Sequence, residues 1–355
     1  MIVVRPTCIE DAEKIYAFQQ HHGQPSFSAA AWRQFWLSCP FRKTFDNIPL
    51  GWLLESDEQV IGLLLNVHML YDLGGTLLKA GFASGWLVDP EHRNCSLQLL
   101  NAYFQQKGLD LWLNDSANAT TSKILTAFKV QRIPSLDYDA PLLWPLRTCA
   151  FAAAGLRRHG IPIPELLAFP VGGALQVARW FKHRNSRYPA QVHSVKSFDD
   201  RFDSLWNRIR SANVRLRAVR SSSVLQWRFQ FELADGSAVI LAYGSDEIQG
   251  YAVLVRNFRE QLRLTVCDVA DLQAVDDNPV VLTDLLRAAM HVAHEQGAEA
   301  LRFVGNQGTK RTAALSLSPY SYRTDGWQFY RAARNDLAAT LRSPELWDIS
   351  SFEAF

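Results

Sequence analysis

The segment from Asp89 to Leu100, Asp-Pro-Glu-His-Arg-Asn-Cys-Ser-Leu-Gln-Leu-Leu, places polar residues between an apolar strand and an apolar-faced helix. A helix start offers unpaired backbone amides and the positive end of the helix dipole, which together attract anions such as phosphate. We therefore predict that a phosphate-bearing cofactor binds at residues 93–98. The alternative is an ordinary capped helix, preceded by solvated charges at His92 and Arg93.

Two stretches of the chain each begin with a predicted strand that is followed by a capped helix. Residues 2–5 form a predicted strand, and Thr7-Cys-Ile-Glu10 is a capping box that begins a helix. Residues 191–196 and the segment Ser197-Phe-Asp-Asp200 repeat this pattern. The two caps are 190 positions apart.

Two further signals recur with almost the same offset. The hairpins predicted at 52–62 and 239–250 share a Ser-Asp-Glu turn and are 189 positions apart. The helix-ending glycines Gly108 and Gly297 are also 189 apart, and each precedes a predicted strand. Because the three offsets agree, we predict a duplicated fold.

Each copy is expected to contain a strand, a helix, a variable segment, three antiparallel strands, a helix, a strand, a helix and a final strand. This order predicts an α/β fold, an α+β arrangement with a mixed sheet flanked by helices. We predict an N-terminal domain over residues 1–146, a helical linker over 147–189, a C-terminal domain over 190–340 and a tail over 341–355.

Composition narrows the classes of function. The 355 residues are 48% hydrophobic and 20% charged with a net charge of +2, which is typical of a compact protein and does not favour nucleic acid as a partner. The five cysteines are scattered and lack metal-ligand spacing, so we expect no metal site. With no pattern of a signal peptide or membrane span, we expect a cytoplasmic location.

The loop and the start of the chain resemble the GNAT superfamily of acyl-CoA N-acyltransferases. Its phosphate loop reads Arg/Gln-x-x-Gly-x-Gly/Ala, and the opening Arg5-Pro-Thr-x-x-x-Asp-Ala12 is also similar to that family. The resemblance implies two tandem GNAT-like domains, with acetyl-CoA or another acyl-CoA bound to the first. Ser96 and Gln98 stand where the family has its two glycines. The cofactor-binding residues that the resemblance implies are Trp86, Leu87, Val88, Arg93, Asn94, Cys95, Ser96, Leu97, Gln98, Asn118 and Phe128.

At the matching point the second copy reads Asp276-Asp277-Asn278-Pro279. Asparagine and proline suit a helix start, but the two carboxylates occupy the position of a pyrophosphate. Like-charge repulsion therefore predicts that the second copy does not bind acyl-CoA.

The resemblance implies that an amine attacks a thioester in a gap between two splayed parallel strands, where positioning and oxyanion donors supply most of the rate. The family often uses a glutamate on the strand before the loop and a tyrosine on the next helix. Here the strand 80–88 holds no carboxylate, and Phe128 replaces the tyrosine. His68, Ser84 and Asp115 are the candidate catalytic residues instead, although each also fits an ordinary packing or turn role.

Asn114 and Asn118 follow the strand that should line this gap. Their side chains are expected either to hydrogen-bond the amides of the pantetheine arm or to cap a helix.

The segment Arg220-Ser-Ser-Ser-Val-Leu-Gln-Trp227-Arg228 resembles a signature of GNAT-like proteins linked to bacterial surface-polysaccharide biosynthesis. The resemblance implies that Arg220, Trp227 and Arg228 contact an anionic acceptor. The alternative places Leu225 and Trp227 in the core and the arginines at helix ends.

The expected acceptor is an amine on a sugar or small metabolite, held between the copies. Two other functions stay open: a non-catalytic GNAT-like binding or scaffold protein, and a transferase whose donor is acyl carrier protein or aminoacyl-tRNA. A donor of that size predicts a broad basic surface around Arg93, Lys123, Lys129 and Arg132.

The linker suggests a further contact. An apolar stretch over 166–181 is followed by Lys182, His183, Arg184 and Arg187, which together suit an anionic membrane surface. The alternative is a helical linker that packs between the domains.

Overall fold

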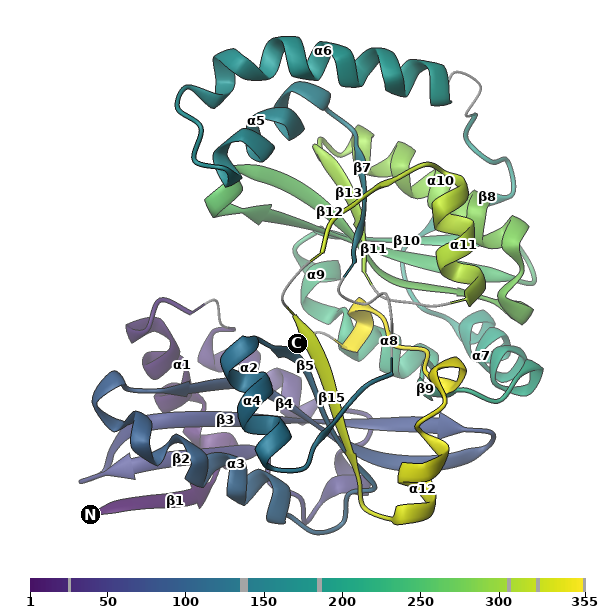
Figure 1. Ribbon diagram of the computed structural model, residues 1–355. Coiled ribbons are helices and arrows are strands. Elements are labelled where there is room, and N and C mark those ends of the chain that lie inside the picture. The colour runs from purple at the N-terminus through teal and green to yellow at the C-terminus, as the bar shows by residue number, and fades with distance from the viewer. Residues whose placement is uncertain (25–26, 135–139, 184–186, 305–307, 324–325, 354–355) are drawn as a thin grey trace.

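The chain forms two α/β units in the computed structural model, and Figure 1 shows one unit above the other. The structure describes all residues except 25–26, 135–139, 184–186, 305–307, 324–325 and 354–355. The side chains at 115–116 and 177–183 also lie outside this description.

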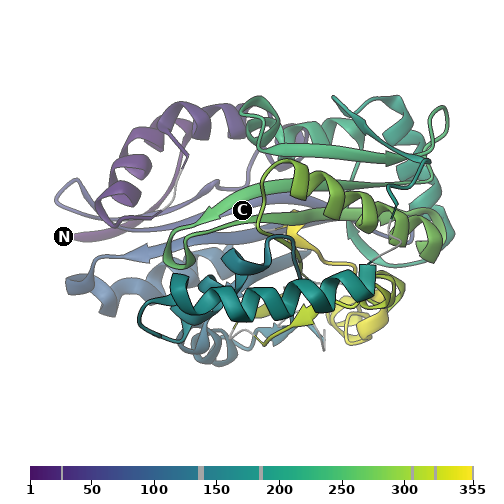
Figure 2. The same cartoon turned by 90° about the horizontal axis from the view of Figure 1, so that it is seen from above.

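The first sheet is antiparallel throughout, apart from the parallel neighbours β4 and β5. Its strands in spatial order are β1 (Ile2–Pro6), β2 (Gly51–Ser56), β3 (Gln59–Leu73), β4 (Thr76–Val88), β5 (Leu111–Ala117), β15 (Trp327–Ala332) and β6 (Gln131–Arg132), with β9 (Leu216–Ala218) paired to the far end of β3. Helices α1 (Ala12–His21) and α2 (Ala29–Leu37) cover one face, and α3 (Ser96–Gln105) lies on the other (Figure 2). Helix α4 (Ala119–Ala127) follows β5.

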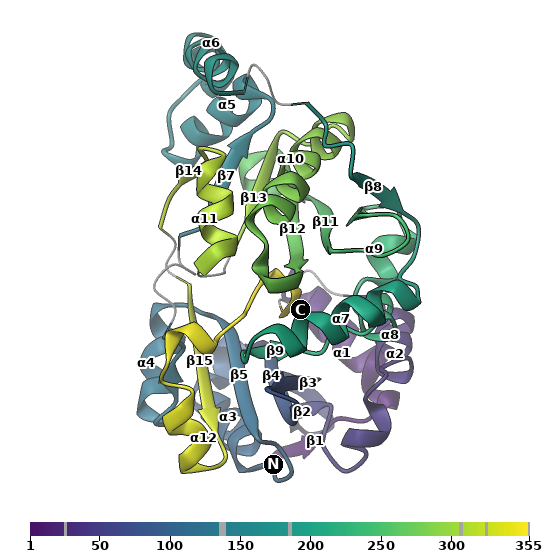
Figure 3. The ribbon, with the colours of Figure 1, turned by 90° about the vertical axis from the view of Figure 1, so that its right-hand side faces the viewer.

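The second sheet repeats this plan, with β12 and β13 as its parallel pair. Its strands in spatial order are β14 (Tyr320–Ser321), β7 (Leu142–Pro145), β13 (Ala300–Phe303), β12 (Leu264–Ala274), β11 (Gly250–Arg259), β10 (Ala238–Tyr243) and β8 (Val192–Val195). The helices that follow β8 in the chain are α7 (Asp200–Ala212), α8 (Ser222–Arg228), α9 (Gln230–Ala234), α10 (Pro279–Glu295) and α11 (Gly308–Ser316), whereas α12 (Asn335–Thr340) lies beside β15 in the first unit (Figure 3). The predicted duplication of a mixed α/β unit is confirmed.

The predicted helical linker contains α5 (Thr148–Arg158) and α6 (Pro164–His183), which form a hairpin at the outer end of the second unit (Figure 1). Across the described residues, no helix combines the length and the hydropathy that a membrane crossing requires.

The capping boxes lie slightly later than predicted. In the first copy, Cys8 is the cap, and its amide donates to the Asp11 carboxylate at 2.9 Å. In the second copy, Asp199 rather than Ser197 is the cap, and it accepts from the amide of Arg201. In the first copy Asp11 therefore takes the role predicted for Glu10, and in the second copy the Asp199 carboxylate takes the role predicted for the Ser197 hydroxyl.

The predicted domain boundaries at 146 and 340 are wrong in one respect, because the copies exchange their last central strands. β7 leaves the N-terminal half and pairs between β13 and β14, whereas β15 returns from the C-terminal half to pair between β5 and β6. In Figure 3, β15 lies beside β5 in the lower unit. Neither sheet is complete without a strand from the other half of the chain.

A continuous apolar core joins the two halves. Leu54 from the first sheet belongs to the same buried cluster as Phe202 on α7, Trp227 on α8 and Phe352 near the end of the chain. A second cluster fills the space between the second sheet and α10. The contact between the units is therefore part of the hydrophobic core and not a polar surface contact.

We predict that the first unit loses stability when a residue of the returning strand is truncated. Phe329 on β15 is 3% exposed and packs in the core of the first sheet. Phe329→Ala should cost about 3–5 kcal/mol through lost burial and cavity formation. Urea unfolding followed by tryptophan fluorescence measures this loss.

Phe258→Ala on β11 is the matched control, because Phe258 is 55% exposed. If the two variants unfold at the same urea concentration, the exchanged strand does not stabilise the first unit.

Candidate functional site

The predicted gap between two splayed parallel strands is present in the first sheet. β4 and β5 pair at only three positions, Ala80↔Leu111, Gly81↔Trp112 and Phe82↔Leu113. Beyond this point the strands separate, and β5 pairs only with β15 on its other side. On β4 the ladder with β3 is shifted between Leu63 and Leu65, which makes a bulge that includes Gly85 at φ +60°. The bulge bends β4 away from β5.

Tyr103 on α3 occupies the apex of the gap. Its hydroxyl donates to the Gly81 carbonyl at 2.6 Å and accepts from the Leu113 amide at 3.2 Å. The side chain is 1% exposed, and burial raises the pKa of this phenol well above its usual value. Tyr103 therefore stays protonated at neutral pH and serves as a clamp between β4, β5 and α3.

The gap contains a buried donor and a buried acceptor that have no partner within the described part of the chain. These atoms are Trp86 Nε1 on β4 and Asn114 Oδ1 on β5, and both residues line the same cavity. Unpaired buried polar atoms are costly and rare in folded proteins. A ligand amide supplies the complementary carbonyl and N–H, and the pantetheine arm of coenzyme A contains two amides. The polarity of these two atoms therefore complements the amides of that arm.

The cavity between the strands is small and mostly apolar. Its volume is about 10 Å³, close to that of one water molecule. Its other lining residues are Leu64, Ala83, Leu100, Tyr103, Phe104, Trp112, Leu113, Thr121, Leu125, Val130 and Phe329. The last of these belongs to the exchanged strand, so the C-terminal half of the chain helps to build this wall.

The predicted phosphate loop forms a 3-10 turn, Pro90–Cys95, that leads directly into α3. Arg93, Asn94, Leu97 and Gln98 are exposed, whereas Ser96 is partly buried. Cys95 is buried, and at the helix N-cap it makes no side-chain cap bond. The exposed residues and the helix start are thus accessible to an anion.

The remaining predicted cofactor residues divide into two groups. Trp86, Leu87 and Val88 are partly buried on β4, along the open side of the gap. Asn118 instead caps α4, because its side-chain oxygen accepts from the amides of Thr120 and Thr121. Of the two asparagines considered for the pantetheine amides, Asn114 is therefore the one available.

Phe128 follows α4 and packs against Phe104, with ring centroids 5.6 Å apart. Since Phe104 lines the gap, Phe128 supports the cavity wall from behind. It brings no hydroxyl to the site.

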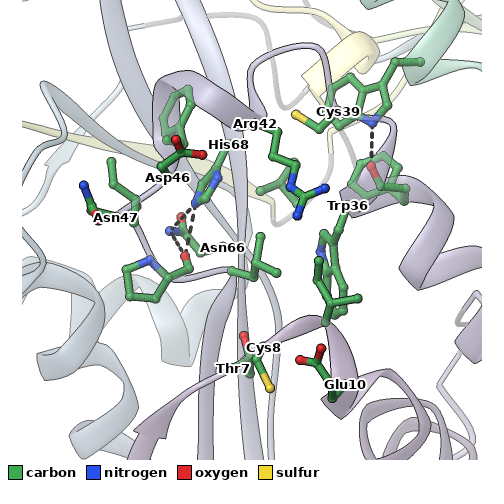
Figure 4. Close-up of a pocket in the computed structure, with 18 residues that line it drawn as sticks. Thr7, Cys8, Glu10, Trp36, Cys39, Arg42, Asp46, Asn47, Asn66 and His68 are labelled. Carbon is green, nitrogen blue, oxygen red and sulfur yellow. Dashed lines mark hydrogen bonds between the residues drawn. The ribbon is translucent and has the colours of Figure 1, made fainter.

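A second, larger cavity of about 470 Å³ lies where β3 has no strand on one side (Figure 4). β2 reaches only to Leu65 of β3, and β9 begins to pair at Tyr71. The cavity is lined by Thr7, Cys8, Ile9, Glu10, Phe35, Trp36, Cys39, Arg42, Phe45, Asp46, Asn47, Ile48, Pro49, Leu50, Asn66, Val67, His68 and Trp227. This volume is typical of a small-molecule site.

The second cavity also contains unpartnered polar atoms. Within the described residues, the buried atoms Thr7 Oγ1 and Asn66 Oδ1 have no hydrogen-bond partner. Asn66 lies directly across the β3–β4 ladder from Ala83, which lines the first cavity. The two cavities are therefore lined by residues that are directly paired on neighbouring strands, β3 and β4. Sequence reasoning missed this site, because its residues come from distant segments and form no motif.

Charged groups of both signs line the larger cavity. Arg42, Glu10 and Asp46 are exposed, and Figure 4 shows Arg42 and Glu10 on opposite sides of the opening. These groups suit an acceptor that carries both an amine and an acidic group.

The three predicted catalytic residues do not converge into a reacting group. His68 lies in the larger cavity, stacked on Phe45, with Nε2 3.1 Å from the Pro49 carbonyl. Burial lowers the pKa of His68 to about 4, although the Pro49 hydrogen bond opposes this shift. Ser84 is partly buried on β4 at the bulge. Asp115 lies in β5, but its side chain falls outside the described residues.

In the second copy the equivalent cleft is filled by the chain itself. Asp271 and Gln273 on β12 lie beyond the last β12–β13 pair, Val269↔Phe303. Lys310 on α11 donates to Gln273 at 3.0 Å and forms an ion pair with Asp348 at 2.7 Å. All these polar side chains are buried and paired with one another.

Arg220 belongs to this buried network, which corrects the prediction that it contacts substrate. Its guanidinium is 1% exposed and donates to Asp271 at 2.8 Å, to the Ala218 carbonyl and to Ser350. It also pairs with Glu353 at 3.4 Å. With protein groups on every side, Arg220 is a structural ion-pair residue.

Trp227 and Arg228 are likewise held by the protein. The Trp227 ring stacks on Phe35, and its Nε1 donates to the Phe35 carbonyl at 2.8 Å. Arg228 donates to the Phe352 carbonyl and pairs with Glu232. Trp227 nevertheless lines the larger cavity, so the second copy does contribute one predicted residue to a candidate site.

The fold is similar to that of solved acyltransferases over nearly the whole chain. A GCN5-related N-acetyltransferase from Anabaena variabilis has a TM-score of 0.57 at 10% identity, covering 94% of this chain and 73% of that one. N-myristoyltransferase from Saccharomyces cerevisiae with bound myristoyl-CoA and inhibitors has a TM-score of 0.61 at 10% identity, covering 93% and 79%. Neither a family model nor a curated protein matches the sequence. The shared fold is that of two tandem GNAT-like domains.

We predict that His68 makes the protein less stable in mild acid. Its pKa falls from 6.5 to about 4 on folding, so between these values the unfolded chain binds more protons and stability rises with pH. His68 alone should lower the free energy of unfolding by about 2 kcal/mol between pH 7 and pH 5. Urea unfolding of His68→Gln should show a pH dependence weaker by that amount.

The matched control is His159→Gln, at an exposed histidine after α5. An unchanged pH dependence in His68→Gln would contradict a buried, neutral His68.

Proposed function

We propose that this protein transfers a short acyl group, acetyl above all, from acyl-CoA in the first unit to an amine acceptor in the larger cavity. The observation that carries this proposal is the pair of unpartnered atoms, Trp86 Nε1 and Asn114 Oδ1, in the gap between β4 and β5. Similar folds with bound myristoyl-CoA support an acyl-CoA in such a fold.

The residues present divide the work of holding the cofactor. Trp86 and Asn114 bind the amides of the pantetheine arm, and Arg93 and the start of α3 bind the pyrophosphate. The space between the strands is about 10 Å³, so β4 and β5 part further when the arm binds, and a short acyl group requires less of this opening than a long chain. When bound, acyl-CoA supplies a thioester carbonyl for attack by an amine.

The filled cleft of the second copy supports a single donor site. Lys310 and Asp348 occupy the region that remains open between β4 and β5 in the first copy. The second copy then has a different role, which is to provide β15 and Trp227 to the walls of the two cavities.

The larger cavity is where we place the acceptor. Arg42 binds an acidic group, and the carboxylates of Glu10 and Asp46 hold the ammonium until it loses its proton to water. His68 does not take this proton, because its Nε2 contacts the Pro49 carbonyl and its pKa is about 4. An amino sugar with an acidic substituent fits these charges, which agrees with a cytoplasmic role in surface-polysaccharide biosynthesis.

One observation favours a second candidate function. Phe128 brings no acid to the gap, which suits a GNAT-like protein that binds its ligands without catalysis. A macromolecular donor is a third candidate, since Arg93, Lys123, Lys129 and Arg132 are all exposed.

The first measurement is a calorimetric titration with coenzyme A and acetyl-CoA. We expect micromolar binding, which Ser96→Trp abolishes by blocking the loop and Arg93→Glu weakens by charge repulsion. Asn114→Leu should weaken binding about tenfold, since it removes one buried hydrogen bond to the ligand.

Val280→Trp is the matched control for Ser96→Trp, because Val280 is 62% exposed and lies in the first turn of α10, as Ser96 lies in the first turn of α3. If the wild-type protein binds neither compound, the proposed transfer from acyl-CoA is wrong. The result would then favour a transferase with a carrier-bound donor or a non-catalytic binding protein. If it binds acetyl-CoA but acetylates no amine, the non-catalytic function remains.

The role of Arg42 is tested with amino sugars that carry or lack a phosphate. Arg42→Ala should raise KM about tenfold for the phosphorylated acceptors and leave the affinity for acetyl-CoA unchanged, because the guanidinium contacts only the acceptor. Arg33→Ala, on the adjacent helix α2, is the control. Equal KM values for wild type and Arg42→Ala would place the acceptor elsewhere.

A further inference from the structure

Helix α6 lies at the outer end of the molecule and packs on one side only. Its inward positions Ala168, Gly172 and Leu175 face α5. At Gly172 a Cβ atom would lie 2.7 Å from Cys149 Cα, so the two helices are in close contact. Figures 1 and 3 show no element beyond α6 on its other side.

The outward side of α6 is apolar and uncovered. Leu166 and Phe169 are 69% and 71% exposed, and Leu167 and Val171 are about half exposed at 48% and 46%. Ile163, just before the helix, is 62% exposed. These five residues form the apolar face of α6. A group of exposed apolar side chains of this kind is typical of a surface that binds another protein or a membrane.

Charge does not interrupt the apolar face in the part of α6 whose side chains are described. Glu165 is the charged residue of that part, and its carboxylate pairs with Arg157 of α5 at 2.7 Å. The charge of this residue is thus turned toward α5.

The segment that carries the apolar face is strongly basic. Residues 147–189 contain seven Lys and Arg residues and one Glu, although the whole chain has a net charge of only +2. The rest of the chain is therefore net acidic. Arg158 precedes the apolar face in sequence, and Lys182 and Arg187 follow it.

We propose that α6 binds the surface of an anionic lipid bilayer, with its apolar face among the acyl chains and its flanking basic residues at the headgroups. A helix of 20 residues is about 30 Å long and can lie in the plane of the interface. The inward side remains packed on α5, so the helix lies on the bilayer and does not cross it.

A second copy of this chain is the less suitable partner for the apolar face. Two such segments side by side would bring together two strongly basic surfaces, which repel each other. Anionic lipid supplies both the apolar phase and the opposite charge.

The test is flotation of the full-length protein with vesicles, and it does not depend on acyl transfer. We expect binding to vesicles of phosphatidylglycerol and phosphatidylcholine in equal parts, and at least tenfold weaker binding to phosphatidylcholine alone. High salt should weaken the binding to the anionic vesicles.

The double variant Leu166→Glu, Phe169→Glu should reduce partitioning at least tenfold. Both side chains are exposed, so the variant keeps its fold, which circular dichroism verifies. Phe258→Glu is the matched control, because Phe258 is an exposed aromatic residue on β11 and should leave binding unchanged.

Three results would overturn the proposal. The first is that the wild type does not bind anionic vesicles, and the second is that the double variant binds them as well as the wild type does. The third is that the wild type is a dimer, the double variant is a monomer, and neither binds vesicles.

Discussion

The cleft between β4 and β5 depends on the hydroxyl of Tyr103. At the point where β4 and β5 separate, this hydroxyl donates to the Gly81 carbonyl and accepts from the Leu113 amide. These two hydrogen bonds replace those that a further β4–β5 pair would have made. Without this hydroxyl, two buried backbone groups would lose partners at the same point. The same residue anchors α3, whose start faces the predicted pyrophosphate and whose Leu100 and Phe104 line the gap. One buried hydroxyl thus couples the opening of the strands to the position of the anion site.

The strand exchange makes the two halves of the chain interdependent. Phe329 of β15 lines the cavity between β4 and β5 of the first sheet, and β7 completes the second sheet beside β13. These contacts join residues far apart in sequence, so the first sheet is completed only after nearly the whole chain is available. The copies have therefore diverged in role without separating. One retains an open cleft, and the other fills its own cleft while supplying a strand and a tryptophan to its neighbour.

The sequence predicted features that local chemistry determines. The hairpins, the helix-ending Gly108 and Gly297, and the order of elements follow from periodicity and turn residues, and all are present. The exchange of β7 and β15 could not be predicted, because equivalent strands of a repeat fit either sheet equally well. Nor could the partners of Arg220, since Ser350 and Glu353 lie about 130 positions away. For the same reason the larger cavity, built from four separate segments, left no motif.

The buried network of the second copy also helps the larger cavity to keep its shape. Both ends of α8 are tied to the end of the chain: Arg220 to Ser350 and Glu353, and Arg228 to the Phe352 carbonyl. Buried charges are costly unless they are fully paired, so this network tolerates little displacement. Trp227 lies between the two arginines on this fixed helix and stacks on Phe35 at the cavity wall. The arginines therefore act on the candidate acceptor site indirectly, by holding the tryptophan that closes it.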